Sequence, residues 1–141
     1  MKTAEYESLS DEQLKSLISS GDLYAELKLA YNRYEDLLKE TYDPQAAVPI
    51  YTKLAAAGLL TAYWYIAICY AEGYINGETD PIKELAYLYF VKQNLGKSDI
   101  AADMDLDDPA GSWDGWAAIA QLESQLNDQQ INEAKAFCET I

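Results

Sequence analysis

Residues 44–73 read PQAAVPIYTKLAAAGLLTAYWYIAICYAEG, two apolar runs separated by a glycine at position 58. A glycine that directly follows an apolar run is typical of a helix C-terminus. The alternation of apolar and polar residues that would indicate a strand is absent here and elsewhere in the chain. The stretch therefore predicts two helices, 44–57 and 60–73, joined by a turn at Gly58.

Glycines that follow apolar runs recur along the chain at a nearly constant interval. Gly21 and Gly58 are 37 residues apart, and Gly58 and Gly96 are 38 apart. Ala25 and Ala62 each stand four residues after a glycine, which places a small residue where two helices must approach closely. Self-similarity at this period indicates a helical repeat, in which each unit buries its apolar face by stacking on its neighbours.

Helix start signals complete the prediction. Ser10 and Gln13 have capping-box spacing, and Asp43 and Asp80 each precede a proline at a first helical position. We expect one all-α domain with units at 10–42, 43–79 and 80–126 and a capping helix at 127–141, and an irregular segment at 97–111. The predicted helices are 10–20, 22–40, 44–57, 60–73, 81–95, 112–126 and 128–139.

Residues 47–58 read Ala-Val-Pro-Ile-Tyr-Thr-Lys-Leu-Ala-Ala-Ala-Gly, and residues 62–73 read Ala-Tyr-Trp-Tyr-Ile-Ala-Ile-Cys-Tyr-Ala-Glu-Gly. In these residues the sequence resembles the Sel-one-like repeat family, a relative of the tetratricopeptide repeat. The first helix of that family runs Ala-x-x-Trp-Tyr-x-Lys-Ala-Ala-x-x-Gly, and its second runs Ala-x-x-x-Leu-Gly-x-x-Tyr-x-x-Gly. A further unit begins in the same register at Ala86, Tyr89, Phe90, Lys92 and Gly96.

The resemblance implies a right-handed α-α superhelix, a short solenoid of about three helix-turn-helix repeats and about seven helices, with a concave protein-binding face. The chain departs from the family pattern in three ways. Ala30 and Ala67 stand where the family has glycine, Pro49 lies within a first helix, and 97–111 is an insertion. Pro49 predicts a bend in helix 44–57.

Charge restricts the class of partner. The chain has 24 acidic and 10 basic residues, a net charge of −14, which disfavours binding to nucleic acid and anionic membranes and favours binding to a basic protein.

Residues 54–71 carry no charge, but the glycine in mid-run favours two buried helices over a membrane span. The first residues contain no apolar signal segment, so we expect a cytoplasmic protein.

Residue types argue against catalysis. The chain has no histidine, which removes the commonest general base and the commonest metal ligand. Its two cysteines, Cys69 and Cys138, are too far apart for a redox or zinc motif. No glycine-rich phosphate loop is present. We therefore expect a non-enzymatic protein without a cofactor.

An acidic loop is the sharpest local feature. Residues 101–141 hold nine acidic residues and one basic residue, so much of the net charge is concentrated there. A solvated loop and a partner-binding patch are both open interpretations. Calcium binding is a weaker alternative. Carboxylates occupy positions 1, 3, 5 and 12 of a calcium-loop frame, although position 6 lacks the glycine that such loops usually have. The patch comprises Asp103, Asp105, Asp107, Asp108 and Asp114, and the calcium set comprises Asp103, Asp105, Asp107 and Asp114.

Four aromatic residues are candidates for the binding surface. Trp113 and Trp116 lie beside the acidic loop, where they would anchor a basic partner or pack into the last helix pair. Tyr65 and Tyr87 fall outside the family consensus and are expected to face a partner.

These features support two functions and a weaker third. The first is a small acidic stoichiometric inhibitor, of the immunity-protein kind, that occludes a basic partner such as a toxin. The second is a general adaptor that binds peptides or several proteins in its concave groove. A calcium-responsive switch rests on the acidic loop alone.

Overall fold

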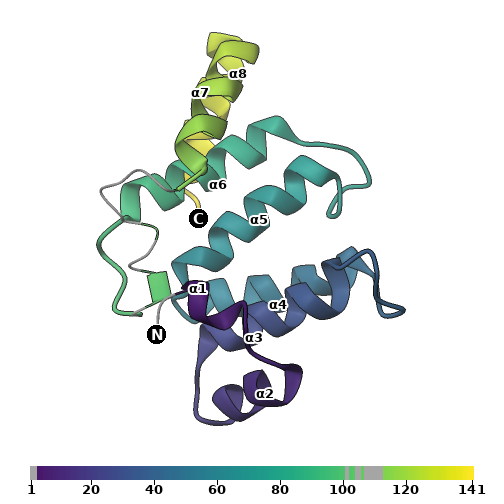
Figure 1. Cartoon of the computed structure of the whole chain (residues 1–141). Helices are drawn as coiled ribbons and strands as arrows, with labels where there is room; N and C mark the ends of the chain where they lie inside the picture. Colours follow the sequence, from purple (N-terminus) through teal and green to yellow (C-terminus); the bar gives the residue numbers. More distant parts are fainter. Residues whose placement is uncertain (1–2, 101, 104–105, 107–112) are drawn as a thin grey trace.

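The computed structural model describes residues 3–100, 102–103, 106 and 113–141, and within them it is all-α, with no strand (Figure 1). Helices that follow one another in sequence pack against each other, which is consistent with the predicted solenoid. The helices are α1 (Thr3–Tyr6), α2 (Asp11–Ser19), α3 (Leu23–Ala30), the π-helix η1 (Tyr31–Glu35), α4 (Pro44–Ala56), α5 (Leu60–Glu72), α6 (Pro81–Asn94), α7 (Gly115–Gln125) and α8 (Asp128–Cys138).

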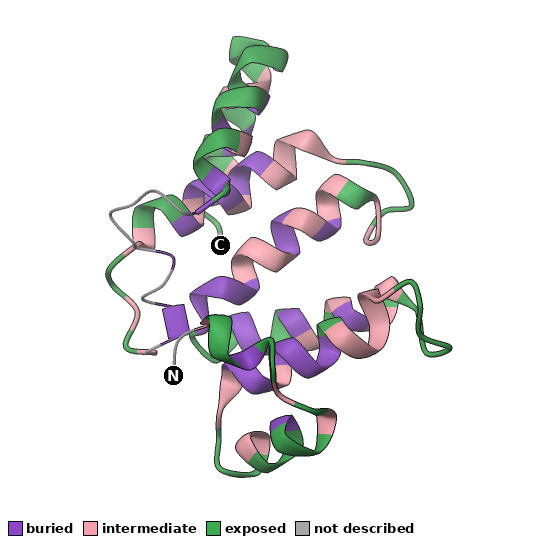
Figure 2. Ribbon diagram, viewed as in Figure 1, coloured by how far each residue is buried: buried purple, intermediate pink, exposed green. Residues whose placement is uncertain are grey.

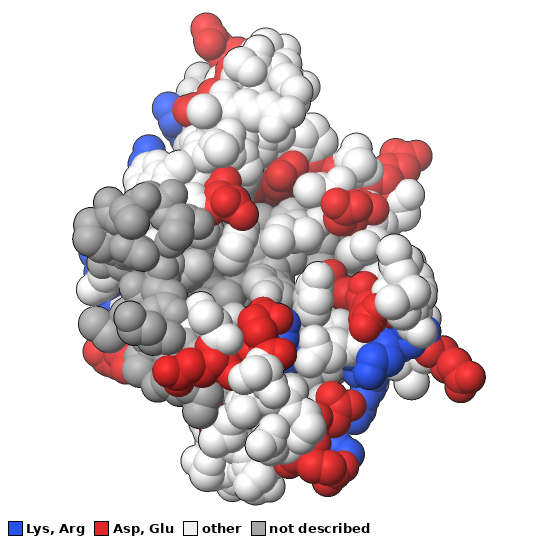
Figure 3. Space-filling model, in the orientation of Figure 1, with Lys and Arg blue, Asp and Glu red and all other residues white. Residues whose placement is uncertain are grey.

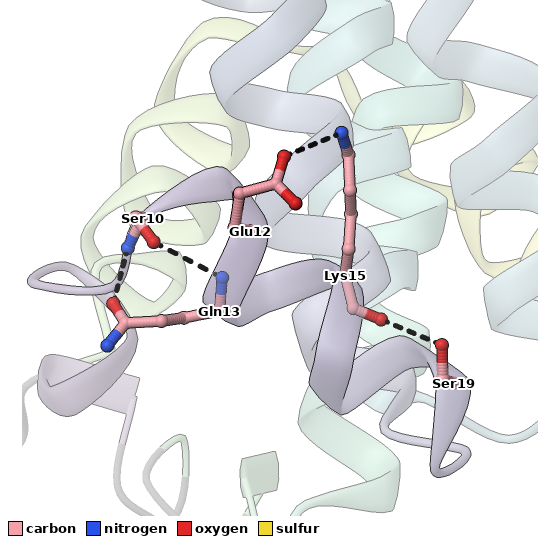
Figure 4. A network of polar contacts seen from close by, with 5 residues as sticks. All are labelled: Ser10, Glu12, Gln13, Lys15 and Ser19. Carbon is pink, nitrogen blue, oxygen red and sulfur yellow. Dashed lines mark hydrogen bonds and ion pairs between the residues drawn. The ribbon is translucent and has the colours of Figure 1, made fainter.

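Side-chain caps start several helices, as the sequence predicted. The capping box of α2 is complete, because the Gln13 backbone N–H donates to Ser10 Oγ and the Ser10 N–H donates to Gln13 Oε1 (Figure 4). Asp80 accepts a hydrogen bond from the Lys83 N–H at the start of α6. Asp43 does not cap α4 with its side chain, and its backbone N–H donates to the Tyr34 carbonyl.

The two glycine turns have the same geometry. Gly58 has a φ of +105°, its N–H donates to the Ala55 carbonyl, and the Leu59 N–H donates to the Leu54 carbonyl. Gly21 has a φ of +93° and an equivalent pair of hydrogen bonds closes α2. A left-handed residue at this point is unfavourable for any residue with a Cβ, which explains why glycine recurs at this period.

The small residues of the repeat lie where they were expected. Ala25 and Ala62 are fully buried, as is Ala67, and Ala30 is 4% exposed. Because they lack long side chains, they let α3 and α5 approach their neighbours closely. Pro49 lies within α4 on an exposed face and does not end the helix.

The predicted helix 22–40 is wrong beyond Glu35. Helix α3 continues into η1 for one turn and stops at Asp36, whose ψ is 112°. The Asp36 side chain accepts a hydrogen bond from the Leu38 N–H, a local turn that competes with helical hydrogen bonds. Thr41 holds the returning chain by donating its hydroxyl to the Arg33 carbonyl. Residues 36–43 consequently form a loop between the first two hairpins.

Helix α5 lies between α4 and α6 (Figure 1), and all of its residues except Glu72 are buried or half-buried (Figure 2). Ala62, Ile66 and Cys69 belong to a core cluster shared with α2, α3 and α4. Leu60 and Ala67 belong to a second cluster shared with α6, α7 and α8. Among the described residues, no helix combines the length and the apolar character needed to cross a bilayer.

Candidate functional site

Asp103, a predicted partner or calcium residue, is buried at the start of α5. Its carboxylate accepts hydrogen bonds from the Leu60 N–H at 2.8 Å, from the Thr61 N–H at 2.9 Å, and from the hydroxyls of Thr61 and Ser98. The N-cap residue of α5 is Leu59, which cannot cap with its side chain, so Asp103 supplies the acceptor from a distant part of the sequence. The expectation of an exposed carboxylate at residue 103 is therefore corrected.

The other acidic-loop residues are not brought together by the described part of the chain. Asp105, Asp107 and Asp108 lie outside the described residues. Asp114 is exposed at the start of α7 and makes no capping hydrogen bond with its side chain. Both oxygens of Asp103 face hydrogen-bond donors rather than open space, which is unlike the arrangement around a cation. Within the described ranges, no group of three acidic or cysteine side chains could hold a metal ion.

The two tryptophans beside the loop differ in exposure. Trp113 is 3% exposed and packs over Gly115, where a Cβ would overlap the indole ring. Trp116 is 46% exposed, and the Lys92 ammonium lies 5.6 Å from its ring centroid. Trp113 is thus a packing residue, as the alternative interpretation held, and Trp116 retains an open face.

Tyr65 and Tyr87 lie on different surfaces. Tyr87 stacks at 5.5 Å on Tyr70 and at 6.4 Å on Tyr63, and its ring lies 6.1 Å from Phe137. Tyr65 instead forms part of the wall of a groove of about 540 Å³. None of the ring neighbours of Tyr87 lines that groove.

The groove is formed by segments far apart in the sequence: the end of α1, helix α3 with η1, the 36–43 loop, and α5 with the residues after it. Its walls are aromatic and its borders carry carboxylates. This combination suits a ligand that has both a cationic and a flat or apolar part. The lining residues are Glu7, Lys28, Tyr31, Glu35, Leu37, Tyr42, Trp64, Tyr65, Ile68, Glu72 and Tyr74.

A continuous series of aromatic rings links the groove to the tryptophan pair. The ring centroids are 6.0 Å apart for Tyr31 and Tyr65, 5.9 Å for Tyr65 and Trp64, 6.4 Å for Trp64 and Trp113, and 5.7 Å for Trp113 and Trp116. All four contacts are edge-to-face, which is a favourable ring geometry. Two residues that the sequence singled out separately, Tyr65 and Trp113, are therefore joined through Trp64.

Glu35 is the half-buried carboxylate of the groove. Its Oε1 accepts a hydrogen bond of 2.6 Å from the hydroxyl of Tyr51, a fully buried residue of α4. Burial raises the pKa of Glu35, and the nearby charge of Glu72 raises it further, while the Tyr51 hydrogen bond opposes the shift. Burial likewise raises the pKa of the Tyr65 phenol. The sequence pattern missed Glu35, which looked like part of a solvated helix face.

The groove also contains a lysine of the chain itself. Lys28 is 6% exposed, its Nζ lies 2.8 Å from Glu7 Oε1, and it lies 5.2 Å from the Tyr31 ring centroid. An ammonium group is thus held between a carboxylate and a tyrosine ring at one end of the groove. Among the described residues, the other ion pairs are Lys15 with Glu12 and Lys53 with Glu26, neither of which involves Glu35 or Glu72.

Exposed apolar residues lie within residues 31–42, where Tyr31, Leu37 and Tyr42 line the groove and Leu38 follows Leu37 in sequence. Leu38 is 94% exposed, Leu37 is 76% exposed, and Tyr31 and Tyr42 are each 38% exposed. We call these four residues the apolar lip. Trp116 is the other large apolar residue that is exposed among those described. Exposed apolar side chains that cluster next to a concave surface mark an interaction site.

Acidic side chains outnumber basic ones on the face shown in Figure 3. Carboxylates and aromatic rings can bind a cation, and without histidine the groove offers no pairing of nucleophile and base that would support acyl transfer.

Scanning the chain against models of protein families found no match, and comparison with curated proteins and with solved structures found none either.

Proposed function

We propose that the chain is a non-enzymatic protein-binding module that docks a basic protein through the acidic groove and the apolar lip. The observation that carries this proposal is the lip, because four of the five large apolar residues exposed in the described part of the chain lie within residues 31–42, and three of them line the groove together with its carboxylates. An apolar centre with a polar rim is the usual composition of a protein–protein interface.

Within this proposal, the chain is a small stoichiometric inhibitor that occludes its partner in the cytoplasm, as immunity proteins occlude toxins. The net charge of −14 supports it, because a strongly acidic surface accelerates encounter with a basic protein. Membership of the Sel-one-like repeat family is part of the same proposal. It is supported by the two glycine hairpins at Gly21 and Gly58, which have matching backbone geometry.

Affinity capture tests the proposal directly. The full chain, immobilised through a tag, is incubated with lysate of the cells that make it, at low and at high salt. We expect a basic protein at equal stoichiometry that is lost at high salt. Several salt-resistant partners would instead indicate the general adaptor.

Two matched variants locate the surface. Leu37→Ser with Leu38→Ser removes the most exposed residues of the lip without disturbing the core, and we expect it to abolish capture. Trp116→Ser removes an exposed apolar residue elsewhere and should leave capture unchanged. Loss of capture in the Trp116 variant alone would move the interface to the tryptophan pair and contradict the proposal.

A further inference from the structure

We propose that the groove receives an arginine side chain of the basic partner, with its guanidinium group between the rings of Tyr31, Trp64 and Tyr65 and the carboxylates of Glu35 and Glu72. This inference rests on the proposed function and specifies its chemistry. The occupant follows from charge complementarity, because the groove joins aromatic walls to two carboxylates, Glu35 and Glu72, that have no basic partner among the described residues.

Arginine fits this wall better than lysine does. The guanidinium group is planar, lies flat on aromatic faces, and donates hydrogen bonds in a fork that matches carboxylates. Tyr31 and Tyr65 meet edge to face at 6.0 Å, and Tyr65 and Trp64 meet in the same way at 5.9 Å, so the wall presents rings in different orientations. A flat cation can contact one ring face while its N–H groups point to Glu35 or Glu72.

The Lys28 ammonium provides an internal precedent. It lies against Glu7 and over the Tyr31 ring at the same groove, almost fully removed from solvent. This shows that the local arrangement of one carboxylate and one tyrosine ring holds a cation at the groove. Tyr31 also interacts electrostatically with Glu35, and neither Glu35 nor Glu72 forms an ion pair among the described residues.

Binding should strengthen as the pH rises. A guanidinium group favours the charged form of Glu35, whose pKa is raised in the free protein by burial and by Glu72. Below that pKa the carboxyl is neutral and attracts the cation less, so arginine binding releases a proton. Among the described residues, the charged or titratable groups that face Glu35 or share its groove are Glu7, Lys28, Tyr31, Tyr42, Tyr51, Tyr65, Cys69, Glu72 and Tyr74.

The experiment titrates the full ¹⁵N-labelled chain with acetyl-arginine amide and records amide chemical shifts. Acetyl-citrulline amide is the matched probe, since it has the same shape without the charge. We expect saturable shifts confined to residues around the groove, with roughly millimolar affinity for arginine and no saturation for citrulline. The affinity should be lower at acidic pH than at neutral pH, because burial raises the pKa of Glu35 and so favours its neutral form as the pH falls.

Variants that change the charge of the groove test whether its carboxylates bind the guanidinium group. Glu35→Gln with Glu72→Gln keeps an acceptor for the Tyr51 hydroxyl and should weaken arginine binding by about tenfold, as expected for two half-exposed ion pairs. Glu72→Lys places a tethered cation in the groove and should also prevent binding. The control, Glu133→Gln with Glu139→Gln, changes two exposed carboxylates of the C-terminal helix region and should have no effect.

Equal shifts with citrulline, or arginine shifts that survive both groove variants, would overturn the arginine assignment. The capture assay keeps this result separate from the proposed function. If the Glu35 and Glu72 variant still captures the basic protein while the lip variant does not, the docking surface stands and arginine recognition fails. If neither groove nor lip variant affects capture, the proposed function fails as well.

Discussion

Replacing Asp103 with alanine removes the carboxylate that caps the start of α5. Its side chain is 3% exposed, and it is the acceptor for the backbone N–H groups of Leu60 and Thr61. Both of those residues are also buried, with exposed fractions of 4% and 2%. Water therefore has little access to the two N–H groups once the carboxylate is gone.

The structure sets the size of the effect. A buried donor left without an acceptor costs about 1–3 kcal/mol, and the Thr61 hydroxyl also loses its bond of 2.6 Å. Allowing for partial relaxation of two donors, we expect Asp103→Ala to lower the free energy of unfolding by about 3 kcal/mol. For a domain of this size, that lowers Tm by about 10 °C. Asp103→Asn keeps one carbonyl oxygen and should lose about half as much.

Urea unfolding followed by tryptophan fluorescence measures the free energy directly. Asp114→Ala is the control, because that aspartate is exposed and its side chain makes no capping bond, so its effect should stay within about 0.5 kcal/mol. A Thr61→Val variant completes a double-mutant cycle with Asp103→Ala, and the two losses should be less than additive. If Asp103→Ala is as stable as the control, the carboxylate does not secure α5 and the reasoning fails.

Two substitutions and the reactivity of the cysteines test the packing. Gly58→Ala forces a Cβ into a left-handed backbone and should lower the free energy of unfolding by about 1 kcal/mol; an unchanged urea midpoint would contradict this. Gly115→Ala should displace the Trp113 indole, which a red-shifted emission and a lower Tm would report. Burial raises the pKa of Cys69 from 9.0 to about 12, so neither Cys69 nor the buried Cys138 should react with a thiol reagent at pH 8 until the chain unfolds. Since the unfolded thiol ionises first, the stability due to Cys69 is fully present below about pH 9 and is lost between pH 9 and 12.

Local signals predicted most of the fold. Gly21 and Gly58 marked the hairpins because few residues tolerate the left-handed turn at a helix end. The error at residues 36–40 arose because the Asp36 side chain closes a local turn that helix periodicity does not reveal. Helix α1 has four residues, too few for any periodic pattern to indicate it.

The site was less predictable because it is assembled by tertiary contacts. Glu7, Glu35 and Glu72 come from three segments that are brought together only when α1, η1 and α5 pack. Tyr65 was identified because it departs from the repeat consensus, and it does line the groove. Asp103 was misplaced because an acidic loop looks the same in sequence whether its carboxylates face solvent or a helix end.

The position of α5 has a consequence for how the chain unfolds. The helix contributes Ile66 and Cys69 to one core cluster and Leu60 and Ala67 to the other. Neither half of the molecule can melt alone without exposing one side of α5 and removing a wall of the remaining core. The repeats should therefore lose structure in a single cooperative transition, so circular dichroism and the fluorescence of the tryptophans on the C-terminal side should give the same urea midpoint.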